Sequence, residues 1–393
     1  MAKDILQSKL FRFDTLGRKG LINAREYSKI TNTPAKHVMH YATSGFEGIL
    51  GVPGVDGNLY ILFLDKHVNR LFKTMEALMI TKPIHLTGIE EMLERSFPDR
   101  DLTRPIPEEA QVYLNITHDE VKEAIFQTIR ENINPISAET SYINPRELVY
   151  VRPNVYRDEK IVDGDDGPVF VSGLGVASIG HQAVLEIMAQ NVPSYLSSAP
   201  EQGARVLVFE TLLLPPGQNY QNGIQTVMRK IKSGANYGLG GVAKNTALAL
   251  GYDEALLLDP NGYVLEGGGE NAFAVFDNQL WTPSLDMSIL PGTKRALVIE
   301  IAREMGINVR EGEISLYDFL NADAAAFSGT WCGFEPIWYV HQASTGKRSN
   351  YKPNNEIIQT LKREYNYLTT GNPKVDSHLA DLSDNIRTLV ELK

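Results

Sequence analysis

The hydrophobic pattern of the first 150 residues predicts both strands and helices. Residues 58–64 are almost continuously apolar, as in a buried strand, and Asp65 follows as a suitable N-cap for a helix. Beyond it, apolar residues recur at helical spacing and predict a buried stripe: Val68, Leu71, Phe72, Met75 and Leu78. Arg70 lies off that stripe. We expect further helices at 89–97 and 120–133, a Pro-rich surface excursion at 97–110 and a strand at 148–151.

The second half of the chain predicts a series of β-hairpins. Residues 255–258 and 263–266 flank the turn Asp-Pro-Asn-Gly, and residues 271–276 and 280–282 flank the turn Asp-Asn-Gln. A strand at 205–209 precedes them. The sequence Pro-Gly-Thr at 291–293 predicts the start of a helix, whose apolar run covers 296–305 and whose end is marked by Gly306. One more helix is expected at 356–365, before a polar tail.

A small, polar stretch at 197–203 separates two apolar segments and predicts a domain boundary. The chain has 393 residues, which is long enough for two large domains. We therefore expect a smaller N-terminal domain over residues 1–197 and an interdomain linker at 198–202. A larger domain with a C-terminal extension should cover residues 203–393. The mixture of elements indicates the α/β class, of the α+β type.

Composition narrows the classes of function. The chain carries 38 basic and 48 acidic residues, a formal charge of −10, which disfavours binding to nucleic acid or to anionic lipid. Cys332 is the single cysteine, so no disulfide can form within the chain, and a reducing, cytoplasmic location is expected. Because no stretch approaches 18 uncharged apolar residues, we expect no membrane span.

Most common catalytic motifs are absent from the sequence. It contains no His-Glu-x-x-His, no paired Cys-x-x-Cys and no Gly-x4-Gly-Lys-Ser/Thr, so zinc hydrolysis and P-loop chemistry have no support. Residues 238–243 fit a loose dinucleotide-binding pattern, but no apolar strand precedes them. A nicotinamide-dependent dehydrogenase is therefore only a remote alternative.

Four segments, at 232–237, 266–271, 290–293 and 328–330, together indicate a more specific chemistry. Lys232 lies among small residues, which suits an imine to a bulky, flat aldehyde. Glu266 precedes three glycines, which would let a ring approach the backbone closely. The Pro-Gly-Thr helix start offers free amide groups and the positive end of the helix dipole to a phosphate. A lysine, an acid and a phosphate anchor are what pyridoxal 5'-phosphate requires.

Further segments extend this pattern: 40–48, the helix that carries Arg70, 150–153 and 251–255. With them the chain resembles the branched-chain aminotransferase family, which is in the fold-type IV class of pyridoxal-phosphate enzymes. The resemblance covers roughly residues 41–336. It implies a two-domain fold, with a smaller N-terminal α/β domain and a larger C-terminal domain rich in antiparallel hairpins. It also implies ping-pong transfer of an amino group between an L-amino acid, branched-chain or otherwise hydrophobic, and 2-oxoglutarate.

The resemblance also assigns roles to the cofactor-binding residues. Lys232 would bond covalently to pyridoxal 5'-phosphate and move the substrate proton, and Glu266 would pair with the pyridine nitrogen. Tyr237 would donate to the ring hydroxyl, and Arg70 would bind the phosphate. Thr293 and Thr330 would also contact the phosphate, and the remaining cofactor-binding residues of these segments would be Gly269, Glu270, Leu290, Gly292 and Lys294. Lys294 stands where the family usually has a threonine, and it either supplies charge to the phosphate or points away and leaves only its amide.

On the substrate side, the resemblance implies that Tyr150 and Arg152 bind carboxylates, the arginine chiefly the distal one of glutamate. Tyr41 and Phe46 would line the side-chain pocket. The turn that contains Gly329 and Trp331 would hold the α-carboxylate. Trp331 is much bulkier than the usual alanine, and a tryptophan of the family is missing at 192–195, so the amino donor stays open. Residues 173–176 resemble a loop that reaches a neighbouring subunit, which implies a homodimer or a higher homo-oligomer.

Other functions remain compatible with parts of this pattern. Within the same fold, the chain could be a pyridoxal-phosphate lyase or a D-amino acid aminotransferase, although Tyr150-x-Arg152-Pro153 argues against both. A non-catalytic binding protein is a further alternative from another class.

Overall fold

The structure is a computed structural model of the protein. It describes residues 9–15, 17, 19–23, 36–81, 112–133, 143–164, 167–171, 176–178, 180–192, 199–210, 230–352, 354–370, 379, 382 and 385–391. The expected helix at 89–97 and the excursion at 97–110 lie outside these residues.

The first of two sheets is antiparallel throughout and has nine strands, in the order β18-β5-β4-β6-β8-β1-β2, with β3 and β7 also paired to β6. Its strands are β1 (Lys9–Asp14), β2 (Lys19–Asn23), β3 (Ser44–Phe46), β4 (Ile49–Pro53), β5 (Leu59–Leu62), β6 (Val149–Gly164), β7 (Gly167–Val171), β8 (His181–Asn191) and β18 (Arg387–Val390). The long β6 pairs with both β4 and β8 and forms the centre of the sheet.

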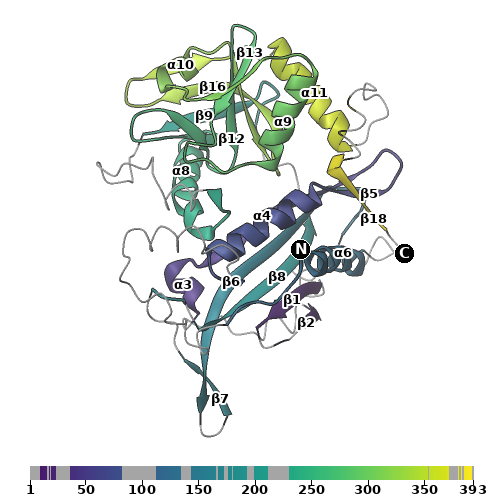
Figure 1. The fold of residues 1–393 in the computed structure, drawn as a ribbon. Coiled ribbons are helices and arrows are strands. Elements are labelled where there is room, and N and C mark those ends of the chain that lie inside the picture. The colour runs from purple at the N-terminus through teal and green to yellow at the C-terminus, as the bar shows by residue number, and fades with distance from the viewer. Residues whose placement is uncertain are drawn as a thin grey trace, which may run out of the picture.

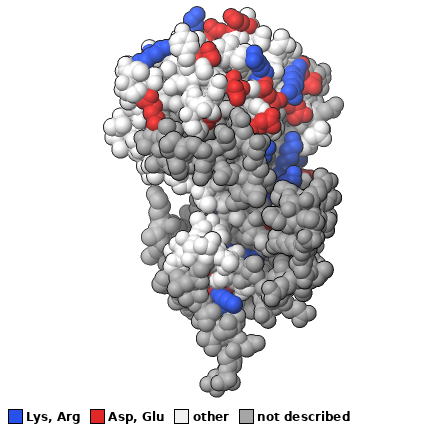
Figure 2. All heavy atoms as spheres, turned by 60° about the vertical axis from the view of Figure 1, so that its left-hand side comes forward, with Lys and Arg blue, Asp and Glu red and all other residues white. Residues whose placement is uncertain are grey.

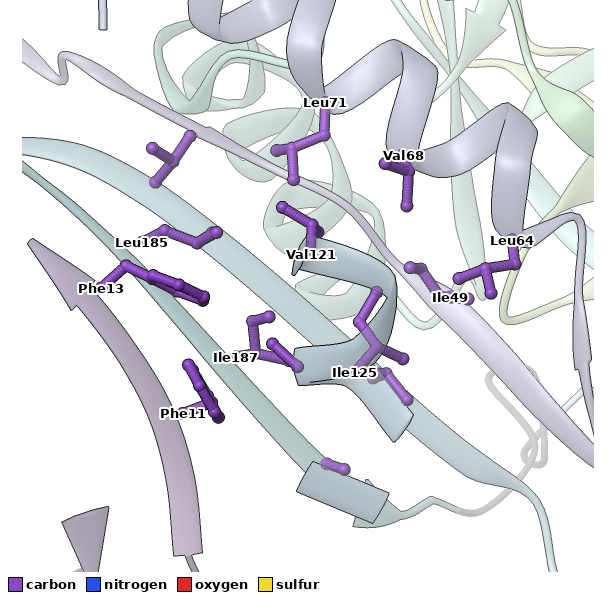
Figure 3. Close-up of a cluster of buried hydrophobic side chains, with 14 of the residues drawn as sticks. Phe11, Phe13, Ile49, Leu64, Val68, Leu71, Val121, Ile125, Leu185 and Ile187 are labelled. Atoms are coloured by element: carbon purple, nitrogen blue, oxygen red, sulfur yellow. The ribbon is translucent and has the colours of Figure 1, made fainter. Parts of the chain in front are cut away.

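Two helices cover one face of this sheet, α4 (Leu64–Ala77) and α6 (His118–Asn132). The second begins with a capping box between Thr117 and Glu120. Figure 3 shows side chains of α4 and α6 pointing toward the apolar side chains of the strands, and it labels Leu64, Val68, Leu71, Val121 and Ile125 against Phe11, Phe13, Ile49, Leu185 and Ile187. The short helix α3 (His37–Tyr41) precedes β3.

The second sheet also has nine strands, in the order β11-β10-β9-β16-β15-β12-β13-β14, with β17 paired to β16. An additional pairing between β11 and β12 closes six of the strands into a ring. The strands are β9 (Ala204–Phe209), β10 (Glu254–Leu258), β11 (Val264–Gly267), β12 (Asn271–Phe276), β13 (Gln279–Pro283), β14 (Val309–Gly312), β15 (Ala324–Gly329), β16 (Gly333–Gln342) and β17 (Lys347–Asn350). Its helices are η2 (Gly234–Asn236), α8 (Tyr237–Ala249), α9 (Thr293–Glu304), α10 (Leu316–Leu320) and α11 (Glu356–Thr370).

Side-chain alternation along β5 joins the two sheets into one molecule. Leu59 and Ile61 face the core under α4 and α6, whereas Leu62 faces a second core that includes side chains of α9 and α11. Phe63, at the start of α4, lies in the same second core. In Figure 1, α4 accordingly crosses the molecule between the first sheet and the second.

Several predicted elements are confirmed, and some of their limits are wrong. Both hairpins form, as β10–β11 and β12–β13, and α9 ends before Gly306, whose φ of 71° suits a glycine. The N-cap of α4 is Phe63 in a left-handed conformation (φ 57°), not Asp65, which lies in the first turn. The strand expected to end at Val151 continues as β6. Pro153 does not stop it, because on this edge β6 pairs with β4 up to Val151 and with β3 from Asn154 onward. Pro153 lies in the gap between these pairings, where no hydrogen bond from its nitrogen is needed. The C-terminal helix is longer than predicted, and the tail after it contains β18.

Charged residues of both signs are interspersed over the face of the second sheet and its helices that is visible in Figure 2. Among the described residues, no helix is long and apolar enough to cross a membrane.

Candidate active site

The backbone of Lys232 is held at the junction of the two sheets by the backbone of β3 and by a side chain of α4. Its carbonyl oxygen accepts a hydrogen bond of 3.0 Å from Phe46 N, and its own amide donates to Thr74 Oγ1 at 3.1 Å. The approach is possible because residue 45 is glycine: a Cβ there would lie 2.4 Å from the Thr74 methyl carbon. The lysine backbone is therefore fixed from two sides before any ligand is considered.

The side chain of Lys232 lies among aromatic rings and positive charges. Its Nζ donates to the Tyr237 hydroxyl and lies 4.9 Å from the centre of the Phe46 ring. Burial, together with the positive charges of Arg70 and Arg152, lowers the pKa of Lys232 to about 7. A lysine with this pKa is substantially uncharged near neutrality, as a nucleophile or a base must be.

Glu266 ends the hairpin at β11, and its carboxylate is held on one side by hydrogen bonds. Its Oε2 accepts from Asn271 Nδ2 at 3.2 Å and from the backbone amide of Leu290 at 3.1 Å. A cleft beside it is lined by the start of α8 and the residues before it, by β10, by the glycine run with its flanking strands and by the loop before α9. The lining residues are Ile231, Asn236, Tyr237, Leu239, Gly240, Leu257, Glu266, Gly268, Gly269, Glu270, Asn271 and Leu290. Burial and the charge of Glu266 raise the pKa of Tyr237, so its hydroxyl keeps its proton.

Arg70 is fixed by a buried carboxylate that the sequence analysis did not single out. Glu47 accepts two hydrogen bonds of 2.7 Å from Arg70, through Nε and Nη2, and one of 2.7 Å from His67 Nδ1. Burial opposes the ionisation of Glu47, but the charge and hydrogen bonds of Arg70 outweigh it and lower the pKa of Glu47 to about 2. The remaining Nη1 of Arg70 donates to Pro291 O at 2.9 Å, so the guanidinium lies at the amino end of α9.

His67 extends the same network toward Thr293. Burial lowers the pKa of His67 to about 4, so the ring is neutral, and Nδ1 carries the proton that Glu47 accepts. Its Nε2 then faces the Thr293 hydroxyl at 3.5 Å. The N-cap of α9 is Gly292, where a Cβ would lie 2.1 Å from Asn271 Oδ1. The glycine thus allows the helix to begin directly against the residue that orients Glu266.

Alternation along β6 places the predicted substrate residues on one face. Val149 and Val151 face the core, so Tyr150 and Arg152 face the opposite way. Arg152 donates to the Tyr150 hydroxyl, and its guanidinium lies 4.4 Å from the centre of the Phe46 ring. The Trp331 ring lies 5.3 Å from that of Tyr150. These contacts join Arg152, Tyr150, Phe46 and Trp331 to the group around Lys232.

Glu270 lies behind the glycine run, next to a second buried acid. Burial and the nearby charge of Glu254 raise the pKa of Glu270 to about 8. Gly269 donates its amide to Glu270 at 3.0 Å. A Cβ at Gly329 would lie 3.3 Å from Glu270 Cγ, so the turn that continues into Thr330 passes close to this acid. Of these residues, Gly269 and Glu270 line the cleft beside Glu266.

Other predictions are placed elsewhere or lie outside the described residues. The ring contacts of Tyr41 are to His37 and His40 in α3, so its role in a substrate pocket stays a prediction. Residues 173–175 lie outside the described part of the chain. The glycines of 238–243 lie inside α8 rather than in a turn between a strand and a helix, which removes the structural basis of a dinucleotide site.

The functional residues that the sequence analysis missed are Glu47, His67, Thr74 and Asn271. Each is polar and buried, and each orients a residue that was predicted. A histidine three positions before Arg70 on a helix shares its face, which could have indicated His67. Glu47 could not be assigned in this way, because its partner Arg70 is 23 positions away on another element. Asn271 lies five positions after Glu266, across the turn between β11 and β12, and no local pattern distinguishes it from the neighbouring polar residues.

Comparison with known proteins agrees with this arrangement. The amino-transferase class IV family matches residues 46–338. A branched-chain-amino-acid aminotransferase of Escherichia coli (strain K12) is 28% identical over 316 residues, which cover 79% of this chain and 80% of that protein. A putative branched-chain-amino-acid aminotransferase of Methanocaldococcus jannaschii is 28% identical over 339 residues, or 85% of this chain and 90% of that protein.

The fold is likewise similar to that of solved structures. A branched-chain aminotransferase of Thermoproteus uzoniensis, solved with norvaline, aligns with a TM-score of 0.68 and 23% sequence identity, and the alignment covers 98% of this chain and 100% of that one. Because the family match spans more than half of the chain and includes Lys232, Glu266 and the amino end of α9, the chain belongs to the class IV aminotransferases.

Proposed function

We propose that this protein uses pyridoxal 5'-phosphate to transfer an amino group between a hydrophobic L-amino acid and 2-oxoglutarate. The observation that carries the proposal is the placement of Lys232. Its amine has a pKa lowered to about 7, lies beside the Tyr237 hydroxyl and is influenced by the charges of both Arg70 and Glu266.

The residues present fit this cofactor at each of its polar groups. Lys232 would hold it covalently, Glu266 would pair with its ring nitrogen, and Tyr237 would donate to its ring hydroxyl. Arg70 and the amino end of α9 would hold its phosphate. Gly292 has no Cβ, which lets this helix end lie directly against Asn271, the residue that holds Glu266. When bound, the cofactor supplies an electron sink that stabilises negative charge at the substrate α-carbon.

The protein's own residues then have separate tasks. The Lys232 amine, once released from its covalent bond, is the base that takes the proton from the substrate α-carbon and returns it to the product. Asn271 and the Leu290 amide keep the Glu266 carboxylate in place. Thr74 and Phe46 hold the Lys232 backbone in place, so the amine can move only through rotation of its own side chain.

Arg152 is the group best suited to a dicarboxylate. Its planar guanidinium can bind a carboxylate with two hydrogen bonds, and it lies against the aromatic wall formed by Tyr150 and Phe46. The same wall offers an apolar surface to a hydrophobic side chain. The similar Thermoproteus uzoniensis structure holds norvaline, an apolar amino acid, and the curated relatives are branched-chain enzymes, which supports the hydrophobic half of the proposal.

The location and assembly belong to the same proposal. We expect a cytoplasmic enzyme, because the chain has a single cysteine, and a homodimer, because residues 173–176 resemble a loop that reaches a partner.

Reduction of the protein with borohydride tests the cofactor and its lysine together. After incubation with pyridoxal 5'-phosphate, peptide mass mapping should place the pyridoxyl group on Lys232. Lys232→Ala should bind the cofactor weakly and lack turnover. A pyridoxyl group on Lys230 or Lys244 instead would contradict the assignment.

A screen of L-amino acids against 2-oxoglutarate then tests the substrates. Formation of glutamate from 2-oxoglutarate with valine, leucine or isoleucine as the amino donor supports the proposal. A reduced Lys232 without any amino transfer would keep the cofactor site and reject the reaction.

A further inference from the structure

Lys294 is a buried lysine whose amine has no hydrogen-bond acceptor in the described part of the chain. It is the second residue of α9, and it is 1% exposed. Its Nζ makes no hydrogen bond to a described residue and lies 4.0 Å from the centre of the Phe63 ring. Buried amines normally have polar partners, so this one requires an explanation.

The charged groups that act on Lys294 are positive. Burial disfavours the protonated amine most strongly, and the positive charges of Arg70 and Lys66, both on α4, disfavour it further. The pKa of Lys294 is therefore well below the ordinary value for lysine. His67, on the same helix, is also within electrostatic range and is neutral. Glu47 is the carboxylate of this network, and both of its oxygens are already taken by Arg70 and His67.

The amino end of α9 adds to this positive field. Its N-cap is Gly292, which has no side chain to accept from the first amides, and the first turn contains no acidic residue. The helix dipole therefore points its positive end, uncapped, at the place where Arg70 is bound to the Pro291 carbonyl. Arg70, Lys294 and the positive end of the α9 dipole therefore converge here, and no described acid offsets the charge of Lys294.

We propose that Lys294 is the second cation of an anion site at the amino end of α9 and that the anion is the phosphate group of pyridoxal 5'-phosphate. The inference rests on the proposed function and deepens it. The phosphate is favoured over a substrate carboxylate because Leu290, two residues before Gly292, donates its amide to Glu266, so the segment that leads into the anion site also holds the proposed ring partner.

The lowered pKa of Lys294 has a consequence for the proton balance. A phosphate anion near the amine favours its charged form, so binding should be accompanied by proton uptake. Lys66, His67 and Arg70 are the charged or titratable groups of α4 near Lys294. Arg70 stays charged and cannot supply this change. The neutral His67 could also gain a proton, so the loss of the uptake in a Lys294 variant is what assigns it to Lys294.

The alternative is that Lys294 only fills space beside Phe63. Its aliphatic chain would then pack in the second core, and its amine would be a tolerated defect without a ligand. Replacement by methionine, which is similar in length and uncharged, separates the two explanations.

The experiment compares Lys294→Met with Lys66→Met in the cofactor-free protein. Lys66 is the matched control, because it also lies near Phe63, at 5.4 Å, but is exposed on the outer side of α4. Isothermal titration would measure the binding of pyridoxal 5'-phosphate, inorganic phosphate and pyridoxal, which lacks the phosphate. Repeating the titrations in buffers of different ionisation enthalpy measures the protons taken up.

We expect Lys294→Met to weaken both phosphate-containing ligands by about tenfold or more, as for a lost charged hydrogen bond. The affinity for pyridoxal should be unchanged, the proton uptake should disappear, and Lys66→Met should alter each affinity by less than about twofold. Without phosphate, Lys294→Met should unfold at the same or a higher temperature than the unmodified protein, because it removes a buried amine.

Unchanged binding of phosphate and pyridoxal 5'-phosphate by a folded Lys294→Met protein would overturn the proposal. If that variant does not fold, Lys294→Leu, which also lacks a hydrogen-bond donor, provides the same comparison. If inorganic phosphate binding depends on Lys294 but no covalent cofactor adduct forms on Lys232, the proposed function fails and the anion site stands.

Discussion

The pKa of Lys232, lowered to about 7 by burial and by Arg70 and Arg152, predicts unusual reactivity in the cofactor-free protein. An amine reacts with an acylating reagent only when it is uncharged, and ordinary lysines lose their proton near about pH 10.4. As the pH rises, the labelling rate of Lys232 should therefore increase up to about pH 7 and then level off. Peptide mass mapping after brief labelling measures this rate for each lysine.

Arg152→Met provides a check on the cause. Removal of its positive charge should move the midpoint for Lys232 to higher pH, because the charged form of the lysine is then less disfavoured. A midpoint close to the ordinary lysine value in the unmodified protein would show that the amine is not in the environment described.

Arg152 should discriminate between the two halves of the proposed reaction. Arg152→Ala is expected to weaken glutamate and 2-oxoglutarate by about 1.5–3 kcal/mol, or roughly tenfold to a hundredfold in kcat/KM. A monocarboxylate donor should lose much less, since its side chain does not reach the guanidinium. Single-turnover measurements of each half-reaction test this, and equal losses in both would mean that Arg152 only supports Tyr150 and the strand.

Glu47 should stabilise the protein through its buried contacts with Arg70 and His67. Its pKa is about 2 in the folded protein and about 4.3 in an unfolded chain, so its contribution is present above about pH 4 and is lost as the pH falls toward 2. The shift corresponds to about 3 kcal/mol at neutral pH. Glu47→Gln should be less stable and should lack this part of the acid dependence.

Urea unfolding at several pH values measures that difference. Val390→Ala, which removes buried methyl groups and no titratable contact, is a suitable control: it should lower stability by about 2 kcal/mol with little change in pH dependence. If Glu47→Gln follows the same acid profile as the unmodified protein, the ion pair does not have the role given to it here.

How far the site could be predicted from sequence depends on what each residue does. Lys232, Glu266 and Arg70 lie in short segments with recognisable chemistry, and the structure brings them to one region. Glu47 and His67 act by holding Arg70, and a buried polar residue that acts through another has no local pattern of its own. The direction of Lys294 also needed the fold, since either orientation was compatible with the sequence.

At the scale of the elements, two neighbouring glycines of α8, Gly240 and Gly241, differ in how closely other atoms approach them. A Cβ at Gly240 would lie 2.4 Å from the carbonyl oxygen of Gly268, which is backbone and cannot move freely, whereas a Cβ at Gly241 would meet nothing within 4 Å. Gly240→Ala should therefore push the helix from the glycine run beside Glu266 and destabilise the protein by about 1–3 kcal/mol. Gly241→Ala should be stabilising by about 0.5–1 kcal/mol through helix propensity.

Thermal unfolding of the two variants measures this contrast. Cofactor binding should weaken only in Gly240→Ala, because the cleft beside Glu266 is lined by both Gly240 and Gly268. Equal behaviour of the two alanine variants would show that α8 does not need its close approach to Gly268.

Elements with a strong local pattern were predicted from the sequence, but the residues at which they begin and end were predicted less accurately. The turn of the β12–β13 hairpin contains Asp277 and Asn278, both with positive φ. Aspartate and asparagine adopt this conformation more readily than most residues, so the turn could be predicted from its sequence. The start of α4 was misplaced because Phe63 adopts a left-handed conformation that its sequence does not favour. Its amide donates to the Ile386 carbonyl at 2.7 Å, so a contact from the other end of the chain accompanies this conformation.

At the scale of the whole molecule, the C-terminal segment connects the two sheets. After α11, which packs in the second core, β18 pairs with β5 at the edge of the first sheet. The division at 197–203 stays a prediction, but the last strand belongs with the first sheet rather than with the second. No local pattern could show this, because the pairing joins residues more than 300 positions apart.

Two neighbouring residues of β18 give a direct test of this connection. Val390 is 1% exposed and packs in the core under α4 and α6, whereas Leu389 is 45% exposed. Val390→Ala should lower the free energy of unfolding by about 2 kcal/mol, because it removes buried methyl groups and leaves a cavity. Leu389→Ala should change it by less than about 0.5 kcal/mol.

The effect of Val390→Ala should also be seen at a distance from the substitution. Because β5 leads directly into α4, weaker pairing with β18 should increase hydrogen exchange at the amides of β5 and the first turn of α4. The exchange of β12 and β13, which lie in the other sheet, serves as the internal reference. If Val390→Ala and Leu389→Ala exchange alike at β5, the C-terminal strand does not support the helix that carries Arg70. If only Val390→Ala increases the exchange there, the end of the chain stabilises the element that positions Arg70.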